Sequence, residues 1–206
     1  MNRCVIIGGA DIADYGRIRQ SLRGSDFCIY CDSGLKHEEG IGMKPNLIVG
    51  DFDSHEQPET DVETIVLPCE KDDTDTVYAV REAVRRGFGD FLLIGVIGAR
   101  FDHTFGNVSI LLYLDSLGKT ARIMDDYSEM EIVSRKAAEV DGSFSFFSLL
   151  NISGTAKGIT ICGAKYPLEG GEIRSDYQYG ISNEVLPGKT AVISLLEGCL
   201  LLVKVH

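Results

Sequence analysis

The sequence is short of positive charge. Its 20 lysine and arginine residues face 31 aspartate and glutamate residues, and the formal net charge is −11. A protein that binds nucleic acid needs a basic surface, because it must neutralise phosphate groups along the strand. The composition therefore argues against a nucleic-acid partner. It does not argue against an enzyme that meets phosphates through a metal ion.

Long apolar runs are also missing. No stretch reaches the roughly 18 residues that a membrane helix needs. The first apolar run, residues 4–7, ends at two glycines and is shorter than the roughly 7–15 apolar residues of a signal peptide. We therefore expect a cytoplasmic protein without a membrane partner, in which residues 4–7 form a buried strand.

The standard nucleotide-binding motifs are absent as well. The chain has neither a GxxxxGKS/T loop nor a GxGxxG fingerprint. Among its cysteines, Cys28 and Cys31 form a lone CxxC motif inside an apolar run. In a strand these two positions face opposite sides, so a buried core strand is favoured over the alternative, a zinc site.

Two patterns of hydrophobicity divide the chain. In the first, short apolar runs alternate with segments of helical periodicity. We expect strands at residues 4–7, 27–31, 47–49, 64–67, 91–96 and 121–124, and helices at residues 11–23, 74–86 and 103–117. This alternation predicts an α/β domain with a mostly parallel sheet and helices on both of its faces.

After about residue 127 the pattern becomes β-rich, with no convincing helical period. Apolar runs at residues 131–134, 143–149, 157–162, 191–196 and 199–205 are separated by glycine, asparagine and proline. Such runs are typical of a small antiparallel sandwich or barrel. We predict two domains, residues 1–127 and residues 128–206.

Acidic residues follow the predicted strand at residues 47–49. Asp51 and Asp53 are two positions apart and would point the same way in extended backbone. In open α/β sheets, ligands gather at the carboxyl ends of the strands. Adjacent carboxylates raise each other's pKa unless a cation lies between them, and Mg²⁺ prefers such ligands. The pair predicts a magnesium site; an acidic surface turn is the alternative.

A second acidic cluster, residues 70–75, begins the predicted helix at residues 74–86. Asp72 and Asp75 are three apart and would share a face if the first helical turn includes both. Helix starts also favour acidic and threonine caps. Ligation and capping are both open for this cluster.

A third polar segment, residues 95–103, joins a predicted strand to a predicted helix through a glycine turn. Such a turn exposes backbone N–H groups that suit phosphate, and Arg100 could bind phosphoryl oxygens while Asp102 holds the arginine or a metal. An Arg–Asp pair that only closes the turn is the alternative. With Asp32 after the strand at residues 27–31, four strand ends carry polar groups to one sheet edge. This shared location favours a single metal–phosphate site.

Five segments occur in an order that is typical of one known family. They are CDSG at residues 31–34, KPNLIVGDFDS at 44–54, KDDTD at 71–75, GARFDH at 98–103 and GISNE at 180–184. Together they resemble the thiamine pyrophosphokinase (thiamine diphosphokinase) family over nearly the whole chain. The resemblance implies a Rossmann-like three-layer α/β domain that binds ATP and Mg²⁺. It also implies a C-terminal all-β sandwich that binds thiamine and takes part in dimerisation.

The resemblance also implies an activity and roles for individual residues. The family transfers pyrophosphate from ATP to the hydroxyl of thiamine, which gives thiamine diphosphate and AMP, and it works as a homodimer with sites at the interface. The implied catalytic residues are Asp51, Asp53, Asp75, Arg100 and Asp102, of which Asp51, Asp53 and Asp75 would hold Mg²⁺. The implied ATP contacts are Asp32, Lys71, Asp72, Thr74, Arg100 and His103, and the implied thiamine contacts are Ser182 and Asn183.

Some choices stay open within this resemblance. Asp75 and Asp102 are both candidates for the general base. Because the chain has no tryptophan, an aromatic that stacks on thiamine must be tyrosine or phenylalanine, and Tyr177 and Tyr179 are candidates. Ser33, Val77 and Ala99 depart from the usual pattern of the family. Two alternative functions therefore remain: a pyrophosphokinase of another primary alcohol, such as a hydroxymethylpterin, and an inactive nucleotide- or metal-binding relative.

Overall fold

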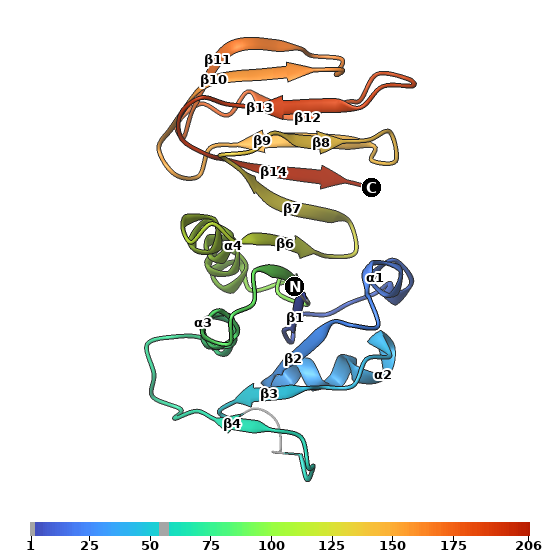
Figure 1. Cartoon of the computed structure of the whole chain (residues 1–206), viewed down its shortest axis with the longest axis vertical. Coiled ribbons are helices and arrows are strands. Elements are labelled where there is room, and N and C mark those ends of the chain that lie inside the picture. Colours follow the sequence, from blue (N-terminus) through green and yellow to red (C-terminus); the bar gives the residue numbers. More distant parts are fainter. Residues whose placement is uncertain (1–2, 54–57) are drawn as a thin grey trace. The chain divides into compact units, whose positions relative to one another are not determined.

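The computed structural model describes residues 3–53 and 58–206 (Figure 1). Ser54, the last residue of the GDFDS segment, lies outside the described residues. The chain is a mixed α/β protein with a large sheet and a second sheet. It divides into two compact units, Met1–Asp126 (unit 1) and Tyr127–His206 (unit 2).

The described residues of unit 1 contain six parallel strands. They are β1 (Cys4–Ile7), β2 (Phe27–Cys31), β3 (Leu47–Gly50), β4 (Thr64–Val66), β5 (Asp90–Ile94) and β6 (Thr120–Met124). They lie in the order β6-β5-β1-β2-β3-β4, and each neighbouring pair is parallel. All residues of β1 and β3 are buried, as continuous apolar runs covered on both faces should be. The expected parallel sheet is confirmed.

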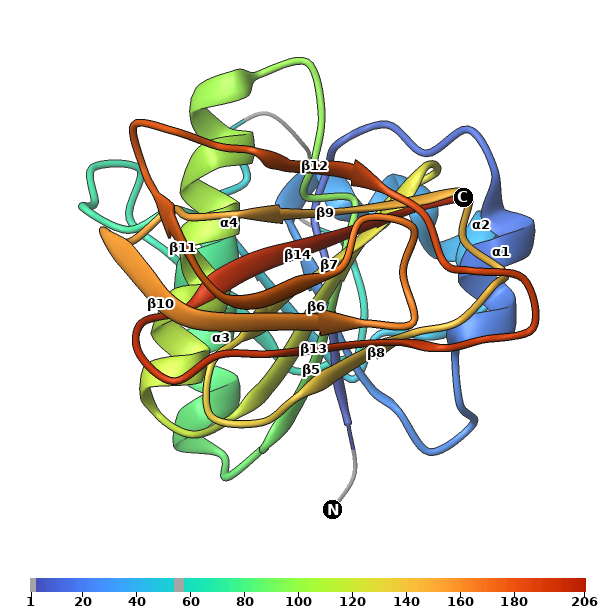
Figure 2. The same ribbon diagram turned by 90° about the horizontal axis from the view of Figure 1, so that it is seen from above.

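Helices cover both faces of these strands. Helices α1 (Tyr15–Ser21) and α2 (Glu38–Ile41) pack on one face, where Ile18 and Ile41 join the cluster around Val5 and Tyr30. Helices α3 (Asp75–Arg85) and α4 (Phe101–Ser116) lie on the other face (Figure 2). Within the described residues, no helix is long and apolar enough to cross a membrane.

A short 3₁₀ helix, η1 (Asp32–His37), directly follows β2 and continues into α2. Neither was expected, because six and four residues are too few to show a helical period. The turn into η1 is sharp, since Asp32 has a φ of 37°. Helix α2 ends at Gly42, whose φ of 76° is the left-handed conformation that glycine adopts without cost.

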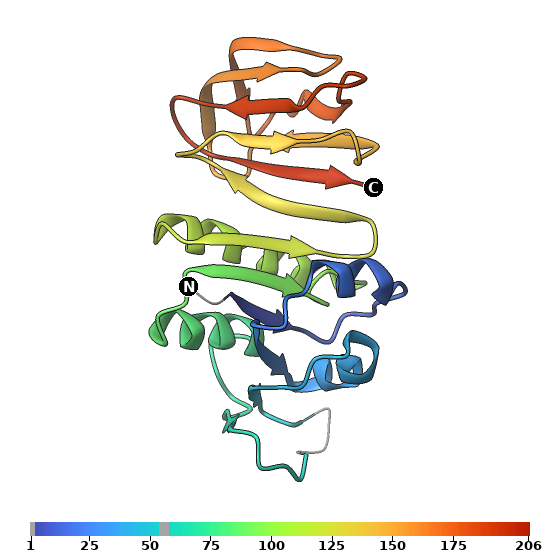
Figure 3. The same ribbon diagram turned by 45° about the vertical axis from the view of Figure 1, so that its right-hand side comes forward.

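Unit 2 is built of strands (Figure 3). They are β7 (Ser128–Val133), β8 (Ala138–Val140), β9 (Phe146–Leu150), β10 (Thr155–Cys162), β11 (Leu168–Arg174), β12 (Gly180–Asn183), β13 (Ala191–Ser194) and β14 (Leu200–Val205). Four lie in the order β12-β9-β14-β7 and four in the order β11-β10-β13-β8, with antiparallel neighbours. Residues of both sets, such as Phe147, Ile159 and Leu202, share one apolar core. Strands β8, β11 and β12 were not predicted, because they are short or carry few apolar residues.

Candidate active site

A cleft of about 500 Å³ lies where β2 and β3 end and α3 begins. We call it the acidic cleft. Most of the residues that the sequence predicted for unit 1 line it: Asp32, Asp51, Asp53, Lys71, Thr74, Asp75, Arg100 and His103. The parallel strands bring these separate segments together, because their carboxyl ends meet at one edge of the sheet.

Three carboxylates form the centre of the acidic cleft. Asp32, Asp51 and Asp75 each place one oxygen within 4.8 Å of the others. Asp32 begins η1, Asp51 directly follows β3, and Asp75 is the first residue of α3. Each carboxylate therefore comes from the end of a regular element, which holds its backbone in place.

Asp53 is not part of this group, and the expected pairing of Asp51 with Asp53 through extended backbone is wrong. Phe52, which separates them, has a φ of 54°, so the chain turns between them. The Asp53 N–H donates to Asp51 Oδ1 at 3.4 Å, and the Asp53 residue is exposed. The turn brings Asp51 towards Asp32 and Asp75, and Asp53 stays at the edge of the cleft.

Lys71 supplies positive charge to the carboxylates. Its ammonium pairs with Asp51 and lies 3.0 Å from Asp75 Oδ1. The hydrogen bond from Lys71 holds the pKa of Asp51 below its usual range. Burial raises the pKa of Asp75, although the same ammonium opposes the rise. Burial alone would lower the pKa of Lys71, but its bonds to Asp51 and Asp75 outweigh burial and raise it.

The donor set fits a divalent cation. Three carboxylates against one ammonium leave an excess of two negative charges when all are ionised. Carboxylate oxygens are the protein ligands that Mg²⁺ prefers, and two or three of them with phosphate oxygens complete its usual shell. Burial is the main cause of the raised pKa of Asp75, and the neighbouring charges of Asp51 and Asp32 add to it; a bound cation would offset both effects.

A second cleft of about 350 Å³ adjoins the first, and we call it the glycine cleft. The two clefts share Gly8, Gly9, Ser33, Thr76, Arg100 and His103. A Cβ atom at Gly9 would lie 1.9 Å from Ser33 Oγ and 3.0 Å from Ser33 Cβ, so a larger residue would force the Ser33 side chain to move. Gly8 and Gly9 were predicted only as the end of a strand, and the pair of glycines directly after the first strand is the signal that could have placed them in a site.

Arg100 and Asp102 form the pair that closes the turn before α4. Arg100 Nη2 lies 2.5 Å from Asp102 Oδ2, and both side chains are largely exposed. This hydrogen bond lowers the pKa of Asp102 to about 2. Arg100 lines both clefts, whereas Asp102 lines neither. The structure therefore contains the Arg–Asp pair that closes the turn, which was the alternative prediction. Arg100 still lines both clefts.

Residues around the start of α3 have two roles: one caps the helix and another reaches the acidic cleft. Thr74 caps α3, because its Oγ1 accepts from the Val77 N–H at 3.3 Å. Asp72 precedes the helix and is exposed, so the expectation that Asp72 and Asp75 share a helical face is wrong. Asp75 reaches the carboxylate group and Asp72 does not line either cleft.

In unit 2, Ser182 and Asn183 end β12 in different environments. Ser182 is exposed, has a φ of 58°, and donates its N–H to Ser148 Oγ at 3.1 Å. Asn183 is buried, and its amide exchanges two hydrogen bonds with the backbone of Tyr166, at 3.0 and 2.8 Å. Asn183 Oδ1 also accepts from the Glu184 N–H. The Asn183 amide therefore supports the fold around β12, and Ser182 is the member of the pair that is open to a ligand.

Tyr177 and Tyr179 lie side by side before β12, with ring centroids 5.5 Å apart. Both rings are exposed, and the Tyr179 hydroxyl donates to the Glu172 carbonyl at 2.7 Å. The hydrogen bond fixes the orientation of Tyr179, which makes it the more rigid of the two aromatic candidates.

A parallel sheet with carboxylates and glycine turns gathered at its carboxyl edge is the arrangement typical of α/β enzymes. Two family models match the sequence. The model of the thiamin pyrophosphokinase catalytic domain matches residues 18–124, and that of the thiamin pyrophosphokinase vitamin B1 binding domain matches residues 130–200. The chain belongs to the thiamin pyrophosphokinase family, which confirms the resemblance drawn from its motifs.

Individual relatives agree with this assignment. A thiamine pyrophosphokinase of Bacillus subtilis is 27% identical over 181 residues, which cover 84% of this chain and 84% of that protein. A crystal structure of thiamine pyrophosphokinase from Bacillus subtilis matches the whole chain with a TM-score of 0.89 at 21% identity, and 99% of that chain is covered. The Geobacillus thermodenitrificans thiamin pyrophosphokinase matches 99% of this chain and 97% of its own with a TM-score of 0.84 at 27% identity.

Proposed function

We propose that the chain is a thiamine diphosphokinase, which transfers the pyrophosphoryl group of ATP to the hydroxyl of thiamine and releases AMP. The observation that carries the proposal is the acidic cleft, in a chain that matches both domains of the family. The adjoining glycine cleft supports it, because glycine turns at strand ends suit a phosphate chain.

We assign the two halves of this task to two domains. Residues 1–127 would form a Rossmann-like three-layer domain, supported by the helices on both faces of its sheet, and would bind ATP, supported by the match to the catalytic domain of the family. Residues 128–206 would form an all-β sandwich, supported by the shared core of its two strand sets, and would bind thiamine, supported by the match to the vitamin B1 binding domain of the family. Cytoplasmic location stays a prediction from the sequence.

Asp32, Asp51 and Asp75 would hold Mg²⁺, and Asp53 lies at the edge of the same cleft. When bound, the ion neutralises charge on the phosphate chain and on departing AMP. This set differs from the predicted set of Asp51, Asp53 and Asp75 in one member. Asp32 takes the central place because it contributes to the carboxylate group and Asp53 does not.

The chain's own residues position the reactants, which is the main demand of phosphoryl transfer. Lys71 is held between Asp51 and Asp75, so its ammonium is already aimed at the site where phosphate charge gathers. Arg100 at the start of α4 is exposed and can turn onto phosphate oxygens. Neither candidate base is favoured, because Asp75 would be engaged by the metal and the hydrogen bond from Arg100 lowers the pKa of Asp102.

The protein would act as a homodimer with sites at the interface, and the partner subunit would supply the segment at Ser182. Exposed apolar side chains on and around β12, including Ile181 and Tyr177, support an interface on this face. The left-handed backbone at Ser182 supports a functional role for that residue, because such strain collects at binding sites.

The experiment incubates the purified protein with ATP, Mg²⁺ and thiamine and separates the products by chromatography. We expect AMP and thiamine diphosphate in equal amounts. Asp51→Asn should abolish both products, whereas Asp61→Asn, at an exposed acid outside either cleft, should not.

Other outcomes would overturn parts of the proposal. ADP in place of AMP would mean transfer of the terminal phosphoryl group. Turnover of a hydroxymethylpterin without turnover of thiamine would move the function to another alcohol. ATP binding with no turnover of any alcohol would identify an inactive relative.

A further inference from the structure

One wall of the glycine cleft is the loop between β1 and α1, and Gly8, Gly9, Ala10 and Asp11 line it. Backbone bonds hold its N–H groups: Gly8 donates to the Ile94 carbonyl and Ala10 to the Gly95 carbonyl, both at 2.8 Å. These bonds fix one edge of the loop against β5. The Ala10 carbonyl points to a different partner.

That partner is His37, which is only 2% exposed and ends η1. His37 Nε2 lies 2.8 Å from the Ala10 carbonyl oxygen, and Nδ1 lies 2.7 Å from the Tyr15 hydroxyl oxygen. A carbonyl only accepts, so Nε2 carries the proton and donates it, and Nδ1 accepts from Tyr15. Burial lowers the pKa of His37, in agreement with a neutral ring.

The helix that His37 ends is the one that Asp32 begins. Asp32 belongs to the carboxylate group, and Ser33 lines both clefts. The imidazole therefore connects the wall of the glycine cleft to the element that carries a carboxylate of the acidic cleft. The fit between loop and helix is close, because a Cβ on Gly34 would lie 2.4 Å from the Ile7 carbonyl oxygen.

We propose that His37 is a positioning residue for nucleotide binding, which holds the loop at Gly8–Ala10 against the end of η1 and so sets how η1 lies beside the glycine cleft. The inference rests on the proposed function, since it takes ATP as the ligand of the joined clefts. His37 does not line either cleft. It acts through the Ala10 carbonyl, and its loss changes the shape of the nucleotide site rather than a contact with the nucleotide.

Two substitutions separate the two hydrogen bonds of the ring. In His37→Gln the side-chain amide nitrogen can replace Nε2 and keep the bond to Ala10. In His37→Asn the amide oxygen can replace Nδ1 and keep the bond from Tyr15, but the side chain is too short to reach Ala10. The protein is used as the whole chain, with Mg²⁺ and ATP, and the Kd for ATP is measured by calorimetry without thiamine.

We expect His37→Asn to raise the Kd and the KM for ATP about tenfold, the effect of one hydrogen bond that fixes a binding wall, with kcat and the KM for thiamine within about twofold. His37→Gln should stay within about threefold of the unsubstituted protein. Lys36→Ala is the matched control, because Lys36 contacts the same loop at Asp11 only through an exposed ion pair. It should leave the Kd for ATP unchanged.

Tyr15→Phe serves as a second variant should His37→Asn fail to fold. It removes the hydroxyl that orients the ring, and a smaller rise in the KM for ATP is expected. An unchanged KM for ATP with a lowered melting temperature in these variants would show that His37 only stabilises the fold. Equal losses in His37→Gln and His37→Asn would also overturn the inference, because the bond to Ala10 would not be the cause. An unsubstituted protein that binds no ATP would instead overturn the proposed function.

Discussion

At the scale of single residues, the described chain has three non-glycine residues with left-handed backbone: Asp32, Phe52 and Ser182. All three lie in motifs that resemble those of the family: CDSG, GDFDS and GISNE. A left-handed φ costs a non-glycine residue roughly 1–2 kcal/mol. The structure accepts this cost at Asp32 and Phe52 because the turns there bring the carboxylates of Asp32 and Asp51 together.

The first prediction concerns Asp75→Asn. Burial raises the pKa of Asp75, so ionisation of this carboxyl lowers the free energy of unfolding when no metal is bound. We expect Asp75→Asn to change the free energy of unfolding by less than about 1 kcal/mol, while turnover falls at least about 100-fold. Denaturant unfolding and product chromatography measure the two effects. A large loss of stability would show that Asp75 is chiefly a structural residue.

The second prediction concerns pH and His37. Burial lowers the pKa of His37 below its ordinary 6.5, although the Ala10 carbonyl and Asp11 oppose this and Lys36 adds to it. Just below pH 6.5, His37 binds a proton in the unfolded chain but stays neutral in the folded chain. The stability that neutral His37 contributes is therefore present above pH 6.5 and is lost as the pH falls from 6.5 through the lower pKa of the folded state. Urea unfolding at several pH values should show this loss in the unsubstituted protein and a smaller loss in His37→Gln.

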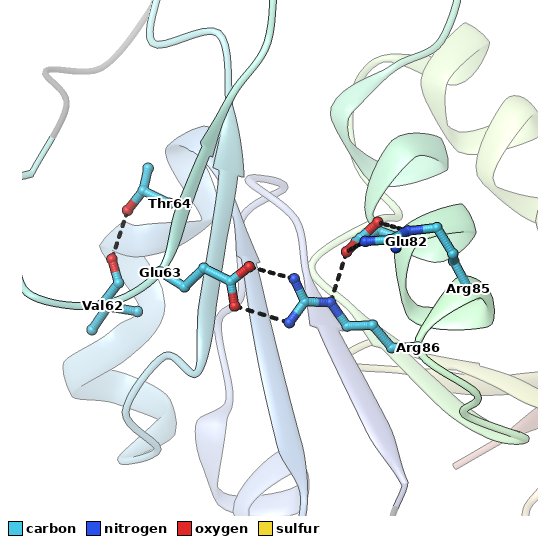
Figure 4. Close-up of polar contacts among 6 residues, drawn as sticks. All are labelled: Val62, Glu63, Thr64, Glu82, Arg85 and Arg86. Carbon is cyan, nitrogen blue, oxygen red and sulfur yellow. Dashed lines mark hydrogen bonds and ion pairs between the residues drawn. The ribbon is translucent and has the colours of Figure 1, made fainter.

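At the scale of elements, the end of α3 is tied to the start of β4 (Figure 4). Arg86 donates to both carboxylate oxygens of Glu63, at 2.9 and 2.5 Å, and through Nε to Glu82 at 2.7 Å. Glu82 is buried and also accepts two bonds from Arg85. Because α3 begins at Asp75, this clamp helps to hold a carboxylate of the acidic cleft in place from the other end of the helix.

The third prediction tests the clamp. Arg86→Met removes the connection to Glu63 and half of the partners of buried Glu82, and we expect a loss of about 2 kcal/mol in the free energy of unfolding. Arg85→Ala is the control. Arg85 is largely exposed and pairs with Glu82 only within the helix, but it donates two bonds to buried Glu82, so its loss should cost about 1 kcal/mol, less than the loss of Arg86. Equal effects of the two substitutions would contradict a clamp between elements.

Helices and strands were predicted correctly where the segment was long enough, or apolar enough, to show its pattern of hydrophobic residues. The valines at 77, 80 and 84 predicted the helix at residues 74–86, and the structure has α3 at Asp75–Arg85. The continuous apolar runs of β1 and β2 were predicted to the residue. Strand β11 was missed, because its sequence LEGGEIR carries few apolar residues and is paired by its neighbour β10 instead. Pairing partners are not visible in the local sequence.

At the scale of the whole molecule, the proposed homodimer makes a specific prediction about mixed subunits. If the partner subunit supplies Ser182, a dimer of one Asp51→Asn subunit and one Ser182→Lys subunit has one intact site and one with both defects. Random exchange of two inactive variants should then restore about a quarter of the unsubstituted activity.

Activity of the mixture after subunit exchange, compared with each variant alone, provides the measurement. No recovery, with dimers present by light scattering, would place Ser182 and Asp51 of each site in one chain. A monomer at working concentration would remove the proposal of shared sites.

The sequence by itself determined most of the longer strands and helices, the division between an α/β part and a β-rich part, and the segments that line the acidic cleft. These depend on local periodicity and on residue types at strand ends, which are read along the chain. Only the tertiary structure decided which side chains meet. The left-handed turn at Phe52 separates Asp53 from Asp51, and the turn at Asp32 brings a third carboxylate to the group. The link from His37 to Ala10 spans 27 positions, and such a contact depends on how the elements pack rather than on any local pattern.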